Sequence, residues 1–119
     1  MENKEFGKKL EERTKAFAIR IIKLSICLPN TVEGKIIRNQ LTKAGSSIGA
    51  NYREANRARS KADFKNKIKI CESESNETCY WLEIIKELKW CDSNDLKSAL
   101  TEGNELLAIF TSISNNLKL

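Results

Sequence analysis

The sequence contains no histidine and no long apolar run, and each absence excludes a class of protein. Without histidine there is no Ser-His or Cys-His nucleophile, and the Glu-x-x-His pairs of di-iron bundles are excluded as well. No stretch approaches the ~18 apolar residues that cross a bilayer. The charged N-terminal residues lack the apolar segment of a signal peptide. We therefore expect a cytoplasmic protein that has no membrane association, no cofactor and no enzymatic activity.

Cysteine is present but scattered, and no two of the four cysteines form a C-x-x-C pair. A zinc site would have to be built from four distant thiolates, so we predict no metal. In a reducing compartment, Cys27 and Cys71 are expected to be small core residues. The sequence does not indicate whether Cys79 or Cys91 is reactive.

Because the chain has only one proline and five glycines, its helix breaks are easy to locate. Pro29 stops one helix, and Asn30 followed by Glu33 is an N-cap pattern that starts the next. Ser60 with the acid three residues later gives a second start, and the cap-rich stretch 91–95 gives a third. These breaks predict four helices, at residues 5–28, 31–58, 61–90 and 93–117, in a single domain that spans residues 1–119.

Each predicted helix carries the alternating three- and four-residue spacing of an element that buries one face. No segment alternates with the period of two that is typical of a strand. The fold class is therefore all-α, an antiparallel up-down-up-down four-helix bundle. The predicted core positions are Leu10, Thr14, Phe17, Ile21, Leu24 and Leu28; Ile37, Leu41, Ala44, Ile48, Asn51, Ala55 and Ala58; Phe64, Ile68, Cys71, Ser75, Thr78, Leu82 and Ile85; and Leu96, Leu100, Gly103, Leu107, Phe110, Ser114 and Leu117.

A second apolar stripe lies beside the main one on the predicted third helix, around Tyr80, Trp81 and Ile84. The first helix has a similar extra stripe with Ile19 and Ile22. No helix of so small a bundle is fully surrounded, so such stripes favour contact with another subunit. We expect a homo-oligomer with Tyr80, Trp81 and Ile84 at its interface. A wide core within one chain is the alternative.

The net charge of +5 is distributed unevenly along the chain. Residues 35–69 hold ten basic side chains against two acidic ones, whereas residues 70–119 hold nine acidic side chains against four basic ones. Clustered basic charge suits a phosphate backbone. A solvated face that keeps the protein soluble is an equally open interpretation. The candidate nucleic-acid-binding residues are Arg53, Arg57, Arg59, Lys61, Lys65 and Lys69.

Four polar residues near the middle of the second and third helices form a further candidate site: Asn51, Arg53, Glu74 and Glu77. The two glutamates lie one helical turn apart, and an antiparallel neighbour brings the other two residues near them. We expect an Arg–Glu network, in the core or at an interface, that fixes the register of the helices or the geometry of the subunits. A pair of catalytic carboxylates, or a site for a ligand or partner, is the alternative.

The second and third predicted helices contain a familiar signature. The stretch Gln40–Ala55 (QLTKAGSSIGANYREA), with SKADF at 60–64, KIKI at 67–70 and ESNETCYWL at 74–82, resembles the bacterial four-helix-bundle family encoded in 23S ribosomal RNA intervening sequences. The resemblance implies a ring-shaped homopentamer and no established activity. It extends to the accessory variability determinant of diversity-generating retroelements, a basic pentamer that works with a reverse transcriptase and RNA.

Two functional hypotheses follow for this chain. The first is a non-enzymatic homo-oligomeric scaffold, pentameric as the resemblance implies, that binds structured RNA or another nucleic acid through the Arg53–Lys69 end. The second is a protein–protein adaptor that uses the apolar face around Tyr80 to hold a protein partner and has no nucleic-acid role.

Overall fold

The computed structural model describes residues 4–117 as four helices joined by three turns, with no strand in that range. The helices are α1 (Lys4–Ser25), α2 (Val32–Ala55), α3 (Lys61–Leu88) and α4 (Ser93–Asn116). Each begins within one residue of its predicted start and ends one to three residues before its predicted end. The all-α, four-helix prediction is confirmed.

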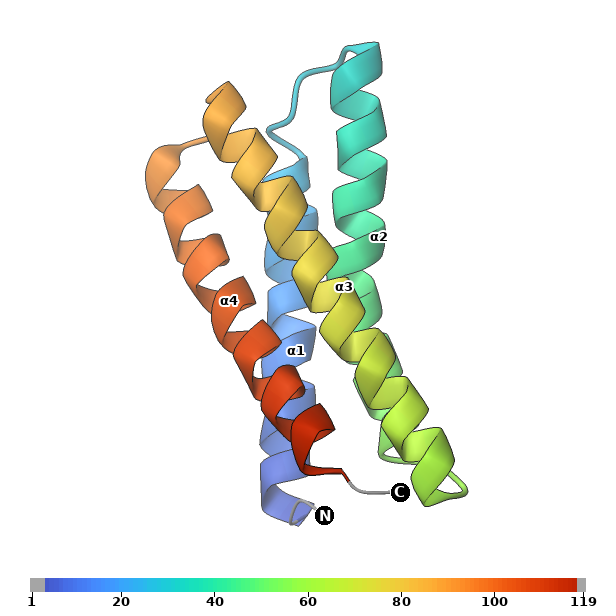
Figure 1. The fold of residues 1–119 in the computed structure, drawn as a ribbon. Coiled ribbons are helices and arrows are strands. Elements are labelled where there is room, and N and C mark those ends of the chain that lie inside the picture. The colour runs from blue at the N-terminus through green and yellow to red at the C-terminus, as the bar shows by residue number, and fades with distance from the viewer. Residues whose placement is uncertain (1–3, 118–119) are drawn as a thin grey trace.

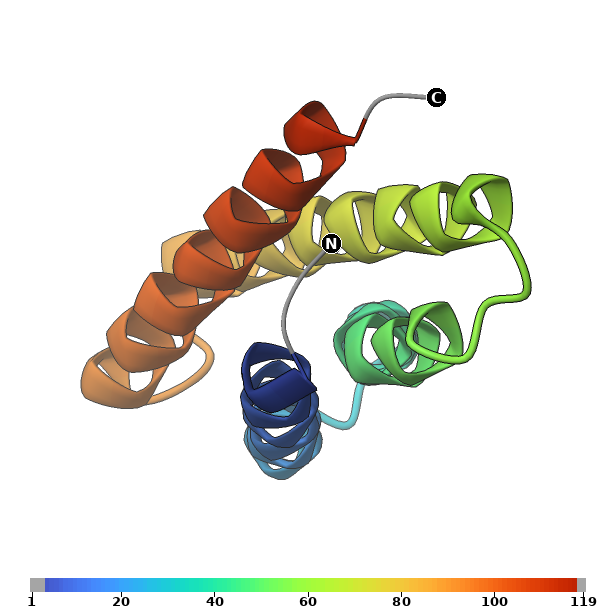
Figure 2. The same cartoon turned by 90° about the horizontal axis from the view of Figure 1, so that it is seen from below.

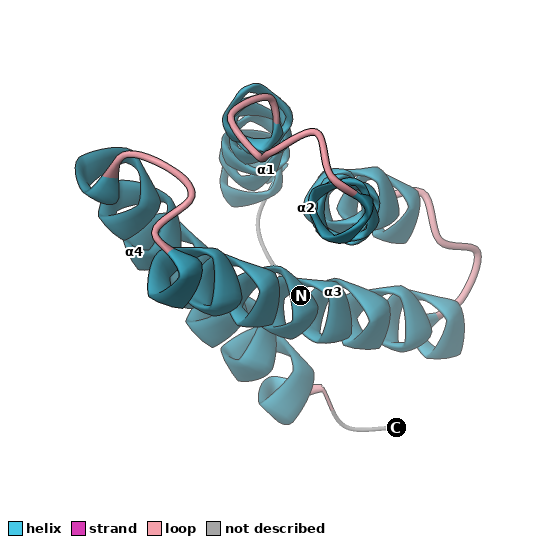
Figure 3. Cartoon of the chain, turned by 90° about the horizontal axis from the view of Figure 1, so that it is seen from above, coloured by secondary structure: helices cyan, strands magenta, loops and turns pink. Residues whose placement is uncertain are grey.

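Successive helices run in opposite directions along a molecule of about 44 × 24 × 20 Å (Figure 1). The start of α1, the end of α4 and the α2–α3 turn lie at one end, which we call the lower end. The α1–α2 and α3–α4 turns lie at the opposite, upper end (Figure 3). The α3–α4 hairpin is inclined to the α1–α2 hairpin (Figure 2). Among the four pairs of neighbouring helices, the three consecutive pairs pack closely, whereas α1 and α4 touch least.

Side chains cap the three helices that follow a turn. Ser60 caps α3 as predicted, and its Oγ accepts a hydrogen bond from the backbone N–H three residues later at 3.0 Å. Helix α2 is capped by Thr31 and not by Asn30, because the chain leaving Pro29 stays extended for one residue more than predicted. Asp92 caps α4 through its Oδ1. Each cap satisfies backbone donors that the first helical turn leaves unpaired.

The first two helices end early because the following residues continue in a tighter winding. The N–H groups of Ile26, Cys27 and Leu28 donate to carbonyls three residues earlier, at 3.1–3.3 Å. After α2, Arg57 and Ala58 donate in the same way. Such three-residue hydrogen bonds are common where an α-helix ends. At the end of α3, Lys89 adopts the left-handed conformation, with φ 58°, that stops the helix.

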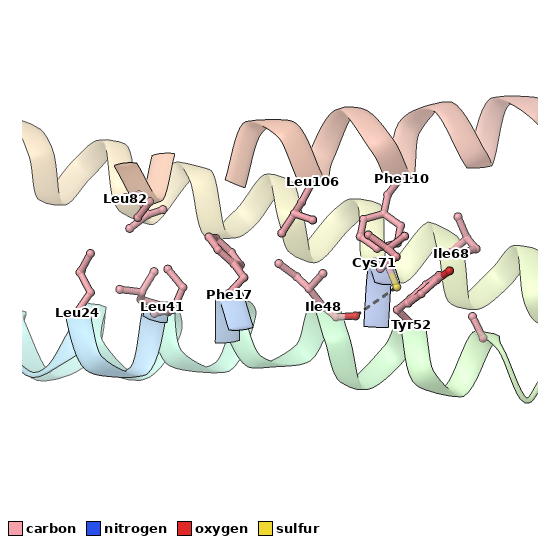
Figure 4. Packing of buried hydrophobic residues seen from close by; sticks show 14 of the residues in the cluster. Phe17, Leu24, Leu41, Ile48, Tyr52, Ile68, Cys71, Leu82, Leu106 and Phe110 are labelled. Atoms are coloured by element: carbon pink, nitrogen blue, oxygen red, sulfur yellow. Dashed lines mark hydrogen bonds between the residues drawn. The ribbon is translucent and has the colours of Figure 1, made fainter. Parts of the chain in front are cut away.

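One hydrophobic core runs the length of the bundle (Figure 4). All the core positions predicted for α1 and α3 are buried. In α2 the prediction of Asn51 as a core residue is wrong: Asn51 is half-buried, and Tyr52 is fully buried with its ring edge-on to Phe110, 5.5 Å between centroids. In α4, Leu106 and not Leu107 is buried. In both helices, the residue beside the predicted one faces the core: Tyr52 in α2 and Leu106 in α4.

The cysteines require a correction. Cys27 is not a reduced core residue: it is exposed and forms a disulfide with Cys91, with 6.0 Å between the Cα atoms. The pairing is possible because the α1–α2 and α3–α4 turns meet at the upper end. Cys71 is buried, as predicted, and forms no disulfide; its thiol donates to the carbonyl of Ile48 at 3.5 Å (Figure 4). Cys79 is also buried and forms no disulfide.

Candidate functional site

The turn between α2 and α3 presents the predicted basic residues at the lower end of the molecule (Figure 1). Arg57, Arg59 and Lys61 are exposed, Lys65 is half-buried, and none of them forms an ion pair within residues 4–117. The turn carries no acidic residue between 55 and 62. Four of the six candidate residues are therefore positive charges that no carboxylate of the described chain neutralises.

The other two candidates at this end each lie beside a carboxylate. Arg53 Nε is 3.9 Å from Glu11 Oε1 on α1, and Lys69 Nζ is 4.0 Å from Glu72 Oε1 on the next turn of α3. Both basic side chains are more than half exposed, so these long ion pairs leave most of their charge facing solvent.

One member of the basic stretch 35–69 has a structural role. Arg38 is half-buried, and its guanidinium donates to the backbone carbonyls of Ser25 at 3.2 Å and Leu28 at 2.7 Å. These contacts satisfy carbonyls at the end of α1. A positive charge there also interacts favourably with the negative end of the helix dipole. Arg38 therefore belongs to the framework at the upper end and is separate from the basic turn.

Helix α1 adds lysines that sequence reasoning did not include. Its exposed Lys4, Lys8 and Lys9 start at the lower end, where the basic turn also lies (Figure 1). Exposed Glu5 and Glu12 lie on the same turns of α1 and offset part of this charge. The alternating direction of the helices was the signal that could have placed these lysines beside the turn.

The predicted Arg–Glu network is not assembled within one chain. Arg53 lies beside Glu11, whereas Glu77 accepts a hydrogen bond from Trp81 Nε1 at 3.2 Å. The member that connects the two helices is Ser47 of α2, which sequence reasoning missed. Its side chain hydrogen-bonds Glu74, and its carbonyl accepts from the side chain of Asn51 at 2.9 Å.

The carboxyl group of Glu74 is partly withdrawn from water between α2 and α3. Burial raises its pKa, and the neighbouring charge of Glu77 raises it further, while the hydrogen bond from Ser47 and the charge of Lys43 act in the opposite direction. In this small polar cluster, Ser47 and Lys43 of α2 therefore stabilise the charged form of Glu74. No arginine takes part in it.

One of the predicted interface residues, Tyr80, lines a shallow groove along α3, which we call the α3 groove. It has a volume of about 400 Å³ and is lined by Ser73, Asn76, Glu77, Tyr80 and Glu83. Tyr80 is 55% exposed, and its ring stands edge-on to the half-buried Trp81, with 5.1 Å between centroids. Ile84 is half-buried beside it on the helix. The groove thus combines an aromatic ring with amide, hydroxyl and carboxylate groups.

A second apolar surface lies on α1. Ile19, Ile22 and Ile26 follow one another at helical spacing and are 46%, 44% and 75% exposed. We call these three residues the α1 stripe. Aliphatic side chains that repeat along one helix face, pointing away from the core, form a surface suited to contact with another molecule.

Polar side chains also join α1 to α4, which the sequence analysis did not predict. Arg13 on α1 forms a two-point ion pair with Glu102 on α4, with both distances 2.7 Å, and also contacts Glu105 at 2.6 Å. Seven residues further along α1, Arg20 donates to the hydroxyl of Ser98. These side chains join the pair of helices that touch least.

A metal-binding cluster and a membrane-spanning helix are both absent from the part of the chain that the structure describes. Within residues 4–117, no three cysteine, aspartate or glutamate side chains gather closely enough to hold a metal ion. No helix in that range is both long and apolar enough to cross a bilayer.

Comparison with known proteins decides the family. Residues 8–112, which run through all four helices, match the model of the 23S rRNA-intervening sequence protein family. The chain belongs to this family. The match confirms the resemblance identified in the sequence.

A solved structure supports the same assignment. A protein of unknown function from the S23 ribosomal protein family of Bacteroides thetaiotaomicron, solved at 1.70 Å resolution, is 35% identical to this chain. The alignment covers 89% of this chain and 98% of that chain, with a TM-score of 0.82. A search of curated proteins finds no match. The function of this family member therefore has to be argued from its own surfaces.

Proposed function

We propose that the protein is a non-enzymatic, cytoplasmic scaffold that assembles as a homopentamer and binds structured RNA or another nucleic acid through its basic turn. One observation supports this most strongly. Arg57, Arg59, Lys61 and Lys65 lie together at one end of the bundle with no carboxylate partner in the described chain.

The chemistry of this end favours contact with the phosphate backbone. Each phosphate that a lysine or arginine neutralises releases counterions, so the affinity depends steeply on salt. The turn from Ala55 to Lys61 contains no aromatic side chain on which an unpaired base could stack. Recognition is therefore expected to follow the shape and charge of a folded nucleic acid, with little dependence on base sequence.

Assembly into a ring is supported by the presence of two unlike surfaces on one protomer. The α3 groove contains Tyr80 and carboxylates, and the α1 stripe is aliphatic. A ring of identical subunits needs a head-to-tail interface made of two different surfaces, whereas a two-fold dimer pairs a surface with itself. In a ring, the basic turns of several protomers would repeat around one rim and add their fields.

The test of the proposal is a charge reversal of the turn. The triple variant Arg57→Glu, Arg59→Glu, Lys61→Glu is expected to lose binding to a structured RNA hairpin at low salt and to keep its helical circular dichroism. The matched control reverses Lys35, Lys86 and Lys97, exposed residues at the upper end. It makes the same change in net charge, so it is expected to keep most of the binding.

The salt dependence gives a second readout. In the wild-type protein, the logarithm of the affinity is expected to fall linearly with the logarithm of the salt concentration, by about one unit of slope for each phosphate contact. Equal affinity of the turn variant and the wild type would refute the nucleic-acid role. Equal losses in both triple variants would mean that net charge alone attracts the RNA.

The competing function is a protein–protein adaptor that binds through the α3 groove. The exposed Tyr80 ring is the observation that favours it. Light scattering with absorbance at 260 and 280 nm on the same peak distinguishes the two. A nucleic-acid-free oligomer that retains a specific protein at high salt favours the adaptor, whereas co-eluting nucleic acid that salt releases favours the scaffold.

A further inference from the structure

The disulfide between Cys27 and Cys91 is accessible from solvent. Cys27 is exposed and Cys91 is half-buried, both in turns at the upper end (Figure 3). The two remaining cysteines, Cys71 and Cys79, are buried in the core. A reductant in solution therefore reaches the disulfide and not the free thiols.

The disulfide connects α1 and α4, the neighbouring helices that otherwise have the smallest contact with each other. It joins the residues just after α1 to the residue just before the cap of α4. Along the rest of this seam, within the described residues, the polar contacts between α1 and α4 come from Arg13 and Arg20. Helices α2 and α3, by contrast, are packed against each other and connected by a short turn.

We propose that Cys27 and Cys91 form a reversible redox clasp that closes the upper end of the α1–α4 seam. This inference goes beyond the proposed function and does not depend on RNA binding. A cellular dithiol supplies the electrons that open the clasp. Its thiolate attacks one sulfur of the Cys27–Cys91 bond, which breaks as a mixed disulfide forms and the other cysteine leaves as a thiolate. The second thiol of the dithiol then attacks the mixed disulfide and displaces the cysteine that is still bound in it.

The exchange conserves electrons and protons. Cys27 and Cys91 together gain two electrons and two protons and become thiols, while the dithiol loses the same and becomes a disulfide. Oxidation in the presence of the disulfide form of the same reagent reverses the step. Because both cysteines lie in turns outside the helices, neither direction requires a helix to unwind.

The buried thiols are poor competitors in this exchange. Burial raises the pKa of the Cys79 thiol to about 11, and the charge of Glu83 raises it in the same direction. At neutral pH this group stays protonated, and a protonated thiol does not attack a disulfide. The exchange therefore remains confined to Cys27 and Cys91.

The experiment compares hydrogen exchange of the full-length protein with the clasp oxidised and reduced. On reduction, amides in the second half of α1 and the first half of α4 are expected to exchange at least about tenfold faster, with a smaller change in the α2–α3 hairpin. The melting temperature is expected to fall by on the order of 10 °C, because the clasp closes a loop with a sequence separation of 64. Maleimide labelling at pH 7 is expected to modify two thiols rapidly in the reduced protein and none in the oxidised one.

The double variant Cys27→Ser, Cys91→Ser is the control, and the reductant is expected to leave its exchange pattern unchanged. Three results would overturn the proposal. The first is rapid labelling of Cys27 and Cys91 after treatment with oxidised dithiol. The second is identical exchange of the α1–α4 seam in both redox states. The third is an equal acceleration in all four helices, which would make the bond a general stabiliser and not a clasp on one seam.

Discussion

Gly45 determines how closely α1 and α2 approach. A Cβ atom at this position would lie 2.7 Å from Cγ2 and 3.0 Å from Cβ of Ile21. Ile21 is fully buried and branched at Cβ, so it has little freedom to turn away. The chain therefore accepts a glycine within a helix, at a cost of about 1 kcal/mol relative to alanine, because close packing of two helices depends on it.

We predict that Gly45→Ala lowers the free energy of unfolding by about 1–3 kcal/mol, because overpacking outweighs the gain in helix propensity. Urea denaturation with the disulfide intact measures the change. Gly7→Ala is the control: its Cβ would lie 3.6 Å from side-chain atoms of Asn56 and Tyr52, an ordinary contact. That variant is expected to be unchanged or slightly more stable. A stabilising Gly45→Ala substitution would contradict the account of helix packing.

At the scale of the elements, the α1–α4 seam differs from the other three because a two-point ion pair spans it. Arg13 holds Glu102 through two hydrogen bonds, and this interaction raises the pKa of the guanidinium even further above its ordinary value. Two-point arginine–carboxylate pairs have a fixed geometry that a lysine cannot reproduce. The pair therefore sets the register of α4 against α1.

We predict that Arg13→Ala lowers the free energy of unfolding by about 1 kcal/mol at low salt, since the pair is partly exposed. Arg13→Lys is expected to lose about half as much. Denaturation of reduced protein at low and at molar salt checks this, because salt should weaken the wild type more than Arg13→Ala. Equal salt sensitivity of the two proteins would mean that the pair contributes no stability.

The sequence predicted the buried faces of α1 and α3 correctly, because the residues of each main stripe recur at helical spacing. In α2 the choice between Asn51 and Tyr52 was open, since both follow Ile48 at helical spacing. A straight helix has 3.6 residues per turn and drifts away from a strict seven-residue pattern. This drift and the large apolar ring of Tyr52 favour burial of Tyr52 over burial of Asn51.

The remaining features that the sequence analysis missed depend on contacts between segments that are distant in the sequence. Leu106 faces the core of α4 in place of Leu107 because α4 packs mainly on α3, and spacing alone does not say on which side the neighbour lies. The pair of Arg13 with Glu102 and the disulfide of Cys27 both join parts of the chain more than sixty residues apart. The basic turn was predictable because its residues are contiguous in sequence.

For the whole molecule, we predict that Tyr80→Glu reduces the assembly to protomers of 13.5 kDa. The substitution removes an exposed aromatic ring from the α3 groove and adds a charge beside Glu77 and Glu83. Like charges brought together at an interface oppose its formation. Light scattering at a fixed protein concentration measures the mass, which is expected to be near five protomers for the wild type.

Tyr80→Phe is the matched control, because it keeps the ring and is expected to keep the wild-type mass. If Tyr80→Glu retained the mass of the wild type, the α3 groove would be free of the subunit interface. The adaptor function would then be the better account of its exposed ring.

The disulfide also changes the connectivity of the chain. With Cys27 joined to Cys91, residues 27–91 form a covalent ring that contains the whole of α2 and α3, and α1 and α4 leave it as two tails. A protease that cuts after Arg57 or Arg59, in the exposed turn, opens this ring without dividing the molecule. The nicked protein migrates as one piece on a non-reducing gel and as two fragments after reduction. Oxidised chains thus tolerate a backbone break at the very turn that is proposed to contact nucleic acid.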